Sequence, residues 1–486
     1  MARLIVVSNR IPAPRQRGVR SGGLEVGLRD AVRQRGGIWF GWSGATAAET
    51  SLSAQISDSR EAVYATIDLS AEDYRKYYVG FANSTLWPLF HYRLGLMEFQ
   101  REELAAYMAV NEAFARALAP LLLPDDLIWI HDYHLIPCGA ALRRLGVLNR
   151  IGFFLHVPCP PSAVFGALPC AATLLRSLSA YDVVGVQTPV DLRGLLDCLE
   201  HIVGARFVGE DLIRVDGKLM CAIAVPMGID TAGFAAQSQR ALHAQETRRL
   251  KDSLANRDLI IGVERLDYSK GLPNRFKAYA RLLKRFPEHC GKVTFLQVAA
   301  RSRVDVEQYR ALRRELDRLA GRVNGDHAEF DWMPLRYITR DVPRAVLAGF
   351  YRCARVGLVT PLRDGMNLVA KEYVAAQDGE NPGVLILSHF AGAAQRMTGA
   401  VQVNPLDPDE IAEAMHLALS MPQSERQARW HSMMETLRVD TAQAWSRNFL
   451  QALSGESQLR DEMLLNVAAR DRIVDEPPAV ELARMP

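Results

Sequence analysis

The pattern that most constrains the fold is an alternation of short apolar runs with amphipathic helical segments, and this pattern begins twice along the chain. Each run is about four to eight residues long and rich in Val, Ile and Leu, as in parallel strands that are buried on both faces. The first series begins at Arg3–Ser8 and the second at Leu259–Glu264. Such alternation places helices on both faces of a mostly parallel sheet. The sequence therefore predicts an α/β protein with two doubly wound, Rossmann-like domains and a crevice between them.

The chain is long enough for both domains, because its 486 residues exceed what one hydrophobic core usually serves. The pattern restarts after Pro226–Asp230, which is the candidate hinge. We expect an N-terminal domain over residues 1–228, a C-terminal domain over residues 229–440, a helix over about 440–453 that packs back onto the first domain, and a polar tail over residues 454–486.

Charge and cysteine content exclude several classes of protein. Lys and Arg together number 58 and Asp and Glu number 55, so no electrostatic signature indicates nucleic acid or an acidic membrane surface as a partner. Seven cysteines without a CxxC pair argue against a disulfide framework or a zinc ribbon and are typical of buried thiols in a reducing compartment. The amino terminus enters a strand directly, and no apolar run is long enough to span a membrane. We expect a cytoplasmic protein.

Local signals predict several further elements. Periodicity indicates one charged helix over Gln237–Arg257 and another over Val306–Leu319. Asp216-Gly217, between two apolar runs, predicts a β-hairpin. Thr188, which precedes Pro189, and Asp407, which precedes Pro408, predict well-defined helix starts.

The stretch Thr360–Glu372, TPLRDGMNLVAKE, follows an apolar run at Val356–Val359 and leads into a helical pattern. Asp364 and Gly365 predict a turn, after which the backbone N–H groups at the helix start favour an anion such as a phosphate. The Glu372 carboxylate is suited to two neighbouring hydroxyls, as a ribose presents them. The alternative is that Asp364 caps the helix and Glu372 is a solvated charge. The first interpretation predicts a nucleotide site at this strand end.

Polar residues also end two predicted strands of the first domain. Asp126–His134 reads as a strand whose end carries His131, Asp132 and His134, with Asp132 and His134 on one face, and a second strand ends at His156. A metal site is one interpretation, but no further carboxylate or cysteine follows at ligand spacing. Polar groups at neighbouring parallel strand ends more often line a ligand crevice, which is the interpretation that we favour.

Cations follow the first two predicted strands of the second domain. Arg265 and Lys270 flank a tight turn after the first of these strands, and Arg301 and Arg303 follow the second. In the first domain, the glycines of Ser21–Gly23 allow a phosphate to approach backbone N–H groups. This loop is not GxGxxG and has no acidic partner about twenty residues later, so the dinucleotide fingerprint of a dehydrogenase is absent.

These motifs occur together in one known family. VSNR, SGG, FGWSG, LWP, FHYR, IWIHDYH, GFFLH, VERLDYSKGLP, TPLRDGMNLVAKEYVAAQ and HFAGAA resemble the retaining trehalose-6-phosphate synthases, from about Ala2 to about Leu450. The resemblance implies two domains of the GT-B type and transfer of glucose from a nucleotide diphosphate glucose to glucose 6-phosphate, with UDP-glucose as the donor that we expect first. The stretch Ala299–Ser302 departs from the family pattern and brings Arg301 near the acceptor site.

The resemblance also assigns residues to roles. The positions that match acceptor-binding residues are Arg10, Trp42, Tyr78, Trp87, Asp132 and Arg303. Those that match donor-binding residues are Gly22, Gly23, His156, Arg265, Lys270, Asp364, Gly365, Met366, Asn367, Leu368, Val369, Ala370, Lys371 and Glu372. Those expected to carry the catalysis are Asp132, His156, Arg265, Lys270 and Asp364.

The implied mechanism is a front-face displacement that uses neither metal nor cofactor, since protein cations and helix N–H groups meet the leaving-group charge. Two other interpretations remain open at this point. One is a related synthase with another donor or acceptor, such as a pseudoglycosyl or glucosylglycerol-phosphate synthase, and the other is a catalytically silent sugar-nucleotide sensor. The family includes oligomers, and the sequence fixes neither the number of subunits of a homo-oligomer nor the nucleotide base.

Overall fold

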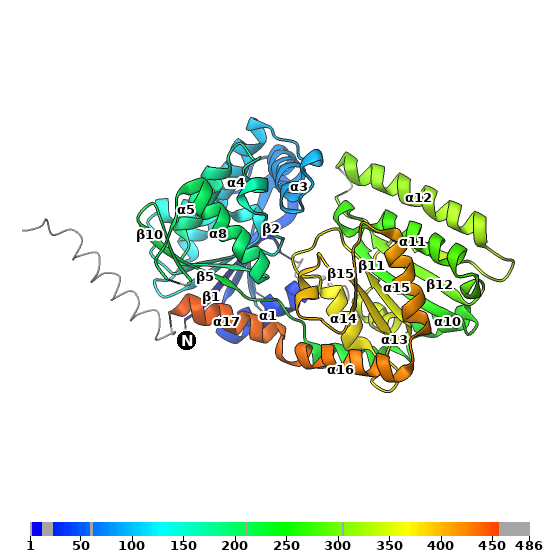
Figure 1. Ribbon diagram of the computed structural model, residues 1–486. Coiled ribbons are helices and arrows are strands. Elements are labelled where there is room, and N and C mark those ends of the chain that lie inside the picture. The colour runs from blue at the N-terminus through cyan, green and yellow to red at the C-terminus, as the bar shows by residue number, and fades with distance from the viewer. Residues whose placement is uncertain (1, 12–22, 59–61, 210, 304–305, 456–486) are drawn as a thin grey trace, which may run out of the picture.

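The computed structural model describes residues 2–11, 23–58, 62–209, 211–303 and 306–455. Two sheets, each with helices on both faces, lie side by side in Figure 1. The mixed α/β architecture with two sheets of parallel strands is the predicted fold class. No helix within these residues is both long enough and apolar enough to cross a membrane.

The N-terminal sheet has the strand order β3-β4-β2-β1-β5-β6-β7-β10-β9-β8. The strands from β4 through β10 in this order are parallel, while β3, β9 and β8 extend the two edges in antiparallel pairing. The strand bounds are β1 Leu4–Arg10, β2 Ile38–Ala47, β3 Gln55–Asp58, β4 Val63–Ser70, β5 Leu127–His131, β6 Ile151–Phe154, β7 Val183–Val186, β8 Arg206–Phe207, β9 Leu212–Val215 and β10 Lys218–Ala224.

Helices of the first unit include α1 Gly23–Arg35, α4 Arg101–Leu118, α5 Cys138–Arg144, α7 Ala171–Ser177 and α8 Pro189–Val203. Thr188 caps α8 as predicted, because its side chain accepts a hydrogen bond from the N–H of Asp191. The hairpin between β9 and β10 is also confirmed, with Asp216 and Gly217 at φ 48° and 79°. The aromatic stretch Tyr74–Leu86 forms a π-helix, which the sequence analysis did not predict.

The C-terminal sheet is entirely parallel, with the order β13-β12-β11-β14-β15-β16. Its strands are β11 Asp258–Arg265, β12 Val293–Ala300, β13 Leu335–Ile338, β14 Val356–Val359, β15 Val384–Ser388 and β16 Val401–Val403. Its helices are α9 Thr231–Ala241, α10 Gln245–Leu254, α11 Leu272–Arg285, α12 Glu307–His327, α13 Arg344–Cys353, α14 Leu368–Ala376, α15 Pro408–Ser420 and α16 Gln423–Val439.

The single helix predicted over Gln237–Arg257 was wrong. The chain forms α9 and α10 with a turn between them, in which the N–H groups of His243 and Ala244 bond to carbonyls of α9. The charged pattern continues across this turn, so periodicity alone did not reveal it. The edge strand β13 was not predicted either, since its run LRYI is short and only Leu335 of it is fully buried.

The last helix, α17 Ala442–Ser454, leaves the second unit and packs against the first sheet (Figure 1). The ring centroids of Trp445 and Phe449 lie 4.7 and 4.6 Å from that of Trp129 on β5. Gly152 and Gly185 make room for this helix, since a Cβ on either would lie within 2.8 Å of the Phe449 ring. The burial of these two aromatic side chains stabilises the return of the chain by roughly 1.5–3 kcal/mol each.

The chain crosses between the two units twice, and the crossings touch. Ile229 pairs with Thr441 in a parallel bridge, and a Cβ at Gly228 would lie 1.9 Å from the carbonyl oxygen of Asp440. Glycine is therefore required where the two crossings meet. The domain boundary at residue 228 stays a prediction.

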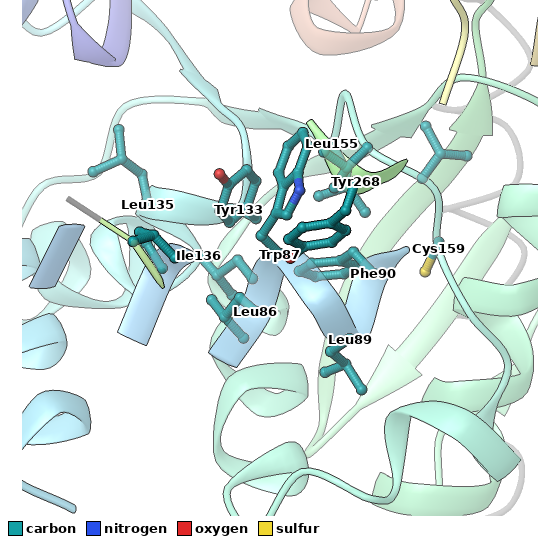
Figure 2. Close-up of a cluster of buried hydrophobic side chains, with 14 of the residues drawn as sticks. Leu86, Trp87, Leu89, Phe90, Tyr133, Leu135, Ile136, Leu155, Cys159 and Tyr268 are labelled. Atoms are coloured by element: carbon teal, nitrogen blue, oxygen red, sulfur yellow. The ribbon is translucent and has the colours of Figure 1, made fainter. Parts of the chain in front are cut away.

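The units also share apolar packing away from these crossings. Figure 2 shows Tyr268, from the segment after β11, among Trp87, Phe90 and Tyr133 of the first unit. The short helix Trp87–Phe90 therefore meets the second unit directly.

Candidate active site

Loops that follow strands of both sheets meet between the two units. β1 and β5 contribute Arg10 and Asp132 from the first unit, and β11, β12 and β14 contribute the loops that carry Lys270, Arg303 and Asp364 from the second. The carboxyl ends of parallel strands are where open α/β sheets bind ligands. The structure therefore brings predicted residues from both halves of the chain to one crevice.

A pocket of about 490 Å³ opens in this crevice, and Arg10, Trp42, Tyr74, Tyr78 and Arg303 are among its lining residues. The Arg10 guanidinium lies 5.6 Å from the centroid of the Trp42 ring. Tyr74 stacks on Tyr78 with 5.6 Å between ring centroids. Two cations from opposite units beside a wall of aromatic rings suit a ligand that joins an anionic group to a sugar.

Arg303 is held by groups of both units. Its guanidinium donates to the Asp267 carboxylate at 3.2 Å, to the Tyr309 hydroxyl at 2.6 Å and to the Tyr133 hydroxyl at 3.0 Å. It also lies 3.8 Å from the centroid of the Trp87 ring, which matches cation–π geometry. Only 5% of the Arg303 side chain is exposed. The orientation of this cation is therefore fixed before any ligand binds.

Asp267 is the carboxylate that compensates the buried positive charge of Arg303. Its side chain is fully buried and also accepts hydrogen bonds from the Ser269 N–H, the Tyr309 hydroxyl and, at 3.4 Å, the Trp87 indole. Burial by itself would raise the pKa of Asp267, but the charges of Arg303 and then Arg265 lower it to about 2. Asp267 is therefore ionised at neutral pH.

Also in the second unit, Lys270 and Asp364 form a buried ion pair with 2.5 Å between Nζ and Oδ2. Asn367 donates to the same carboxylate oxygen at 2.9 Å. Burial opposes ionisation of Asp364, but Lys270 lowers its pKa below the ordinary value. The pair thus presents a fixed cation next to a fixed carboxylate.

Helix α14 begins at Leu368, three residues later than it would begin if Asp364 were its N-cap. Asn367, at φ 76°, caps α14 by accepting from the Ala370 N–H, so Asp364 is free of that task. The backbone N–H groups of residues 365–367 find no acceptor among the described residues. Those of Leu368 and Val369 lie in the first turn of the helix, where no intrahelical acceptor is in reach. This loop retains the features of an anion site.

Gly365 lies directly against the first unit. A Cβ at this position would be 2.1 Å from the carbonyl oxygen of His156, and one at Gly392 would be 1.9 Å from the Gly365 carbonyl. Only glycine permits this approach. The loop after β14 therefore touches the loop after β6 at the centre of the crevice.

The His156 ring is neutral and oriented by neighbours. Its Nε2 lies 3.1 Å from Nδ1 of His131, and its Nδ1 lies 3.2 Å from the Gln187 amide nitrogen. The N–H of Met227 fixes the Gln187 amide, because it bonds to the amide oxygen at 3.0 Å. Burial lowers the pKa of His156 to about 3. Both ring nitrogens have protein partners in this arrangement.

The predicted strand through His134 was wrong. β5 ends at His131, Asp132 has φ 74°, and Tyr133–Leu135 is a short 3₁₀ helix, so Asp132 and His134 do not share a strand face. The Asp132 carboxylate instead accepts a hydrogen bond from the N–H of His156 at 3.2 Å. Burial raises the pKa of Asp132 to about 6, and hydrogen bonds from Tyr133 and His156 oppose this rise.

Among the described residues, no cluster of three metal ligands forms at the ends of β5 and β6. Within the described ranges, one group of three metal-ligating side chains lies close together, and it consists of Glu288, His289 and His416 in the second unit. His134, one of the candidate ligands, stacks on Tyr78 with 5.8 Å between ring centroids. Burial lowers its pKa well below the ordinary value, so it is a neutral ring behind the pocket wall.

The remaining predicted residues differ in placement. Arg265 is exposed, and its guanidinium lies 5.6 Å from the Trp87 ring centroid. Lys371 is 2% exposed and donates to the Met227 carbonyl at 2.7 Å. Glu372 is buried against Arg344 at 2.8 Å, so it is no solvated charge. Gly23 is the first residue of α1, and Gly22 lies outside the described residues.

The sequence analysis missed Tyr74, Tyr133 and Gln187, and it gave Asp267 no role. A signal existed for Asp267, which lies between Arg265 and Lys270 at the end of an apolar run. No pattern in the sequence pairs it with Arg303, since the two lie 36 residues apart in the segments that follow two different strands. Their contact depends on the adjacency of β11 and β12.

Comparison with known proteins identifies the family. Residues 2–455 match the sequence model of glycosyltransferase family 20. A trehalose-6-phosphate synthase of Sinorhizobium fredii is 48% identical over 461 residues, which cover 94% of this chain and 99% of that protein.

Two solved structures are similar in fold and sequence. The first is an α,α-trehalose-phosphate synthase (UDP-forming) of Burkholderia xenovorans in complex with glucose 6-phosphate, at TM-score 0.89, 46% identity, and coverage of 93% of this chain and 100% of that one. The second is the Escherichia coli protein bound to UDP-2-fluoroglucose, at TM-score 0.88, 45% identity, and coverage of 93% and 99%. The family match spans all of the described residues, and the chain therefore belongs to glycosyltransferase family 20.

Proposed function

We propose that this protein is a retaining glucosyltransferase that makes α,α-trehalose 6-phosphate from UDP-glucose and glucose 6-phosphate, the first step of trehalose biosynthesis. The observation that carries the proposal is the pocket in which Arg10 and Arg303, from opposite units, converge beside Trp42 and Tyr78. A dianionic sugar phosphate needs such a pair of guanidinium groups, and its ring suits the aromatic wall. The relatives with the same family motifs are trehalose-6-phosphate synthases, and solved relatives hold glucose 6-phosphate and a UDP-glucose analogue.

In this proposal the diphosphate and ribose of the donor lie against the second unit, while the acceptor phosphate lies between the two units. Arg265 and Lys270 bind the diphosphate of the donor together with the N–H groups that follow Asp364, while the Asp364 carboxylate faces the hydroxyls of the donor glucose. Glu372 and the backbone of residues 368–371 contact the ribose end. Asp132 orients the acceptor hydroxyl, and His156, with its ring held by His131 and Gln187, shapes the floor beside the donor glucose.

The reaction is a front-face displacement. The bond from the anomeric carbon to the diphosphate oxygen breaks, the acceptor hydroxyl oxygen bonds to that carbon on the same face, and the departing phosphate takes the hydroxyl proton. The fixed charges of Arg265 and Lys270 stabilise the negative charge that develops on the leaving group, and they need no reorganisation at that moment. Because the acceptor phosphate contacts both units, its binding also aligns the two substrates.

The two domains of this proposal meet at residue 228, and the enzyme works in the cytoplasm. The compartment is inferred from the thiols, since Cys138, Cys159, Cys170, Cys198 and Cys221 are buried without a disulfide and Cys290 is exposed as a free thiol.

The decisive experiment incubates the purified protein with glucose 6-phosphate and, separately, UDP-, GDP- and ADP-glucose, and analyses the products by NMR and mass spectrometry. We expect trehalose 6-phosphate with two α-anomeric signals, and fastest formation from UDP-glucose. No product from any donor would refute the proposal and would favour a sugar-nucleotide sensor. A product with another acceptor would indicate a related synthase. A trapped covalent glucosyl adduct on Asp132 or Asp364 would exclude the front-face mechanism.

A further inference from the structure

A second cluster of reactive side chains lies in the C-terminal unit and has no part in the proposed reaction. His289 ends a short 3₁₀ helix, Pro287–His289, that follows α11, and His416 lies on α15. Nε2 of His289 is 3.0 Å from Nδ1 of His416, and the Glu288 carboxylate is 3.6 Å from the same Nδ1. One ligand atom from each of the three residues lies within 4.8 Å of the others.

These separations match those across a bound transition metal. Zn²⁺ bonds to imidazole nitrogen at about 2.0–2.1 Å and to carboxylate oxygen at about 2.0–2.2 Å, so two ligand atoms of a tetrahedral ion lie roughly 3.3 Å apart. The observed separations of 3.0 and 3.6 Å bracket that value. The third pair of ligand atoms, from Glu288 and His289, lies within 4.8 Å, so an ion would draw these two side chains together by at most about 1.5 Å.

Packing already fixes the rings. His416 stacks on Phe286 with 4.0 Å between ring centroids and 8° between ring planes. Ion pairs of Arg285 with Asp409 and Glu413 hold the end of α11 against α15. Ligands on two rigid, cross-linked elements lose little freedom on binding, which favours affinity.

The electrostatic surroundings are also suitable. Glu288 and Asp258 supply negative charge near His289, and Lys292 opposes them. Solvent reaches the cluster, because the Glu288 and His416 side chains are 55% and 34% exposed. Water can therefore complete the coordination.

We propose that Glu288, His289 and His416 form a binding site for a divalent transition metal of the zinc class, with water as the fourth ligand. Two imidazoles and one carboxylate favour such an ion over Mg²⁺ or Ca²⁺, which prefer oxygen. The site is remote from the crevice, because α11 starts at the carboxyl end of β11 and runs 14 residues away from it, roughly 21 Å at helical rise. The bound ion therefore joins α15 to the end of α11 and takes no part in glucose transfer.

The test uses tag-free protein freed of metal by a chelator. Zn²⁺ binding is measured by competition with a chromophoric chelator, and Co²⁺ is added separately to record its visible spectrum. We expect one Zn²⁺ per chain, a rise in melting temperature that depends on Zn²⁺ concentration, and the intense absorption of four-coordinate Co²⁺. Glucosyltransferase activity should be the same with and without metal.

His416→Ala and Glu288→Gln are the test variants, and His431→Ala is the matched control. His431 is an exposed histidine whose ring bonds to the Gln427 carbonyl of its own helix. Since loss of an outer partner of a metal ligand already costs about 10–100-fold in affinity, loss of His416 should cost at least about 100-fold. The control should bind Zn²⁺ as the natural protein does. Equal binding by all three variants, or no binding by the natural protein, would overturn the proposal.

Discussion

Arg303→Ala should separate acceptor binding from donor binding. In the proposed function, the Arg303 guanidinium contacts the phosphate of glucose 6-phosphate, and no donor contact is assigned to it. A charge-assisted hydrogen bond of this kind contributes about 1.5–3 kcal/mol, so its loss should raise the KM for glucose 6-phosphate roughly 10- to 150-fold. Arg10 remains on the opposite wall of the pocket, so binding is weakened and not abolished.

The same substitution should also lower stability, through Asp267. Removal of one partner from a buried ion pair costs about 3–5 kcal/mol, because a charge is left without compensation. Asp267 keeps hydrogen bonds from Ser269 and Tyr309, so we expect about 3 kcal/mol. The folded-state pKa of Asp267 is lowered to about 2, so its ionic stabilisation is full above the unfolded value of about 4 and is lost as pH falls toward 2. The gap in unfolding free energy between the two proteins should therefore narrow as pH falls toward 2, where Asp267 gains a proton in the natural protein as well.

Steady-state kinetics with each substrate varied in turn, together with urea unfolding at several pH values, measure both effects. Arg310→Ala is the matched control, because this exposed arginine pairs only locally, with Glu307 at 2.8 Å among the described residues. In the Arg310→Ala protein, neither KM should differ from that of the natural protein by more than about twofold. Its unfolding free energy should fall by less than about 1 kcal/mol, because exposed ion pairs contribute little to stability. Equal increases in both KM values for Arg303→Ala would refute the assignment of Arg303 to the acceptor.

Three further substitutions test the donor side, the contact between the units and the carboxylate that orients the acceptor. Lys270→Met removes the ammonium 2.5 Å from Asp364 and should lower kcat by about 10²-fold at saturating substrates, measured by release of UDP. Gly365→Ala places a methyl group 2.1 Å from the His156 carbonyl oxygen and should lower kcat/KM by about 10²-fold while circular dichroism stays unchanged. Burial raises the pKa of Asp132 to about 6, so kcat/KM should fall as pH drops below 6, where the carboxylate gains a proton and no longer accepts the acceptor hydroxyl. Asp132→Asn should remove that acidic limb, and a limb that persists would assign it to another group.

Elements with a local cause were predictable from the sequence. The hairpin at Asp216-Gly217 formed because those residues tolerate positive φ, and α8 begins after Thr188 because a hydroxyl there accepts an early N–H of the helix. The strand before Thr360 was confirmed for a similar reason, since β-branched and apolar residues fit a strand buried on both faces. Each of these signals lies within a few residues of the element that it specifies.

The sequence predicted which strand ends contribute to the candidate site, but it did not predict which side chains contact one another there. β5 was expected to continue to His134, yet the chain turns at Asp132, where a hydrogen bond from the His156 N–H, 24 residues away, supports the unusual φ. Tyr133 reaches Arg303 across 170 residues. Such pairs depend on which strands become neighbours and on how the two units meet, and no local pattern encodes either.

Some contacts of Arg303 depend on how the two units are placed relative to each other, and others do not. Its guanidinium belongs to the second unit but bonds to Tyr133 and stacks on Trp87, both in the first. Separation of the units would break these contacts and would move Arg303 away from Arg10, so the acceptor pocket is complete only while the crevice is closed. The bonds of Arg303 to Asp267 and Tyr309 lie within the second unit and survive opening, so they keep the guanidinium in place for the next closure. In the proposed function the acceptor phosphate contacts both arginines, so its binding would stabilise the closed state over an open state in which it meets only one cation. The closed state is the one in which Gly365 lies against the His156 carbonyl.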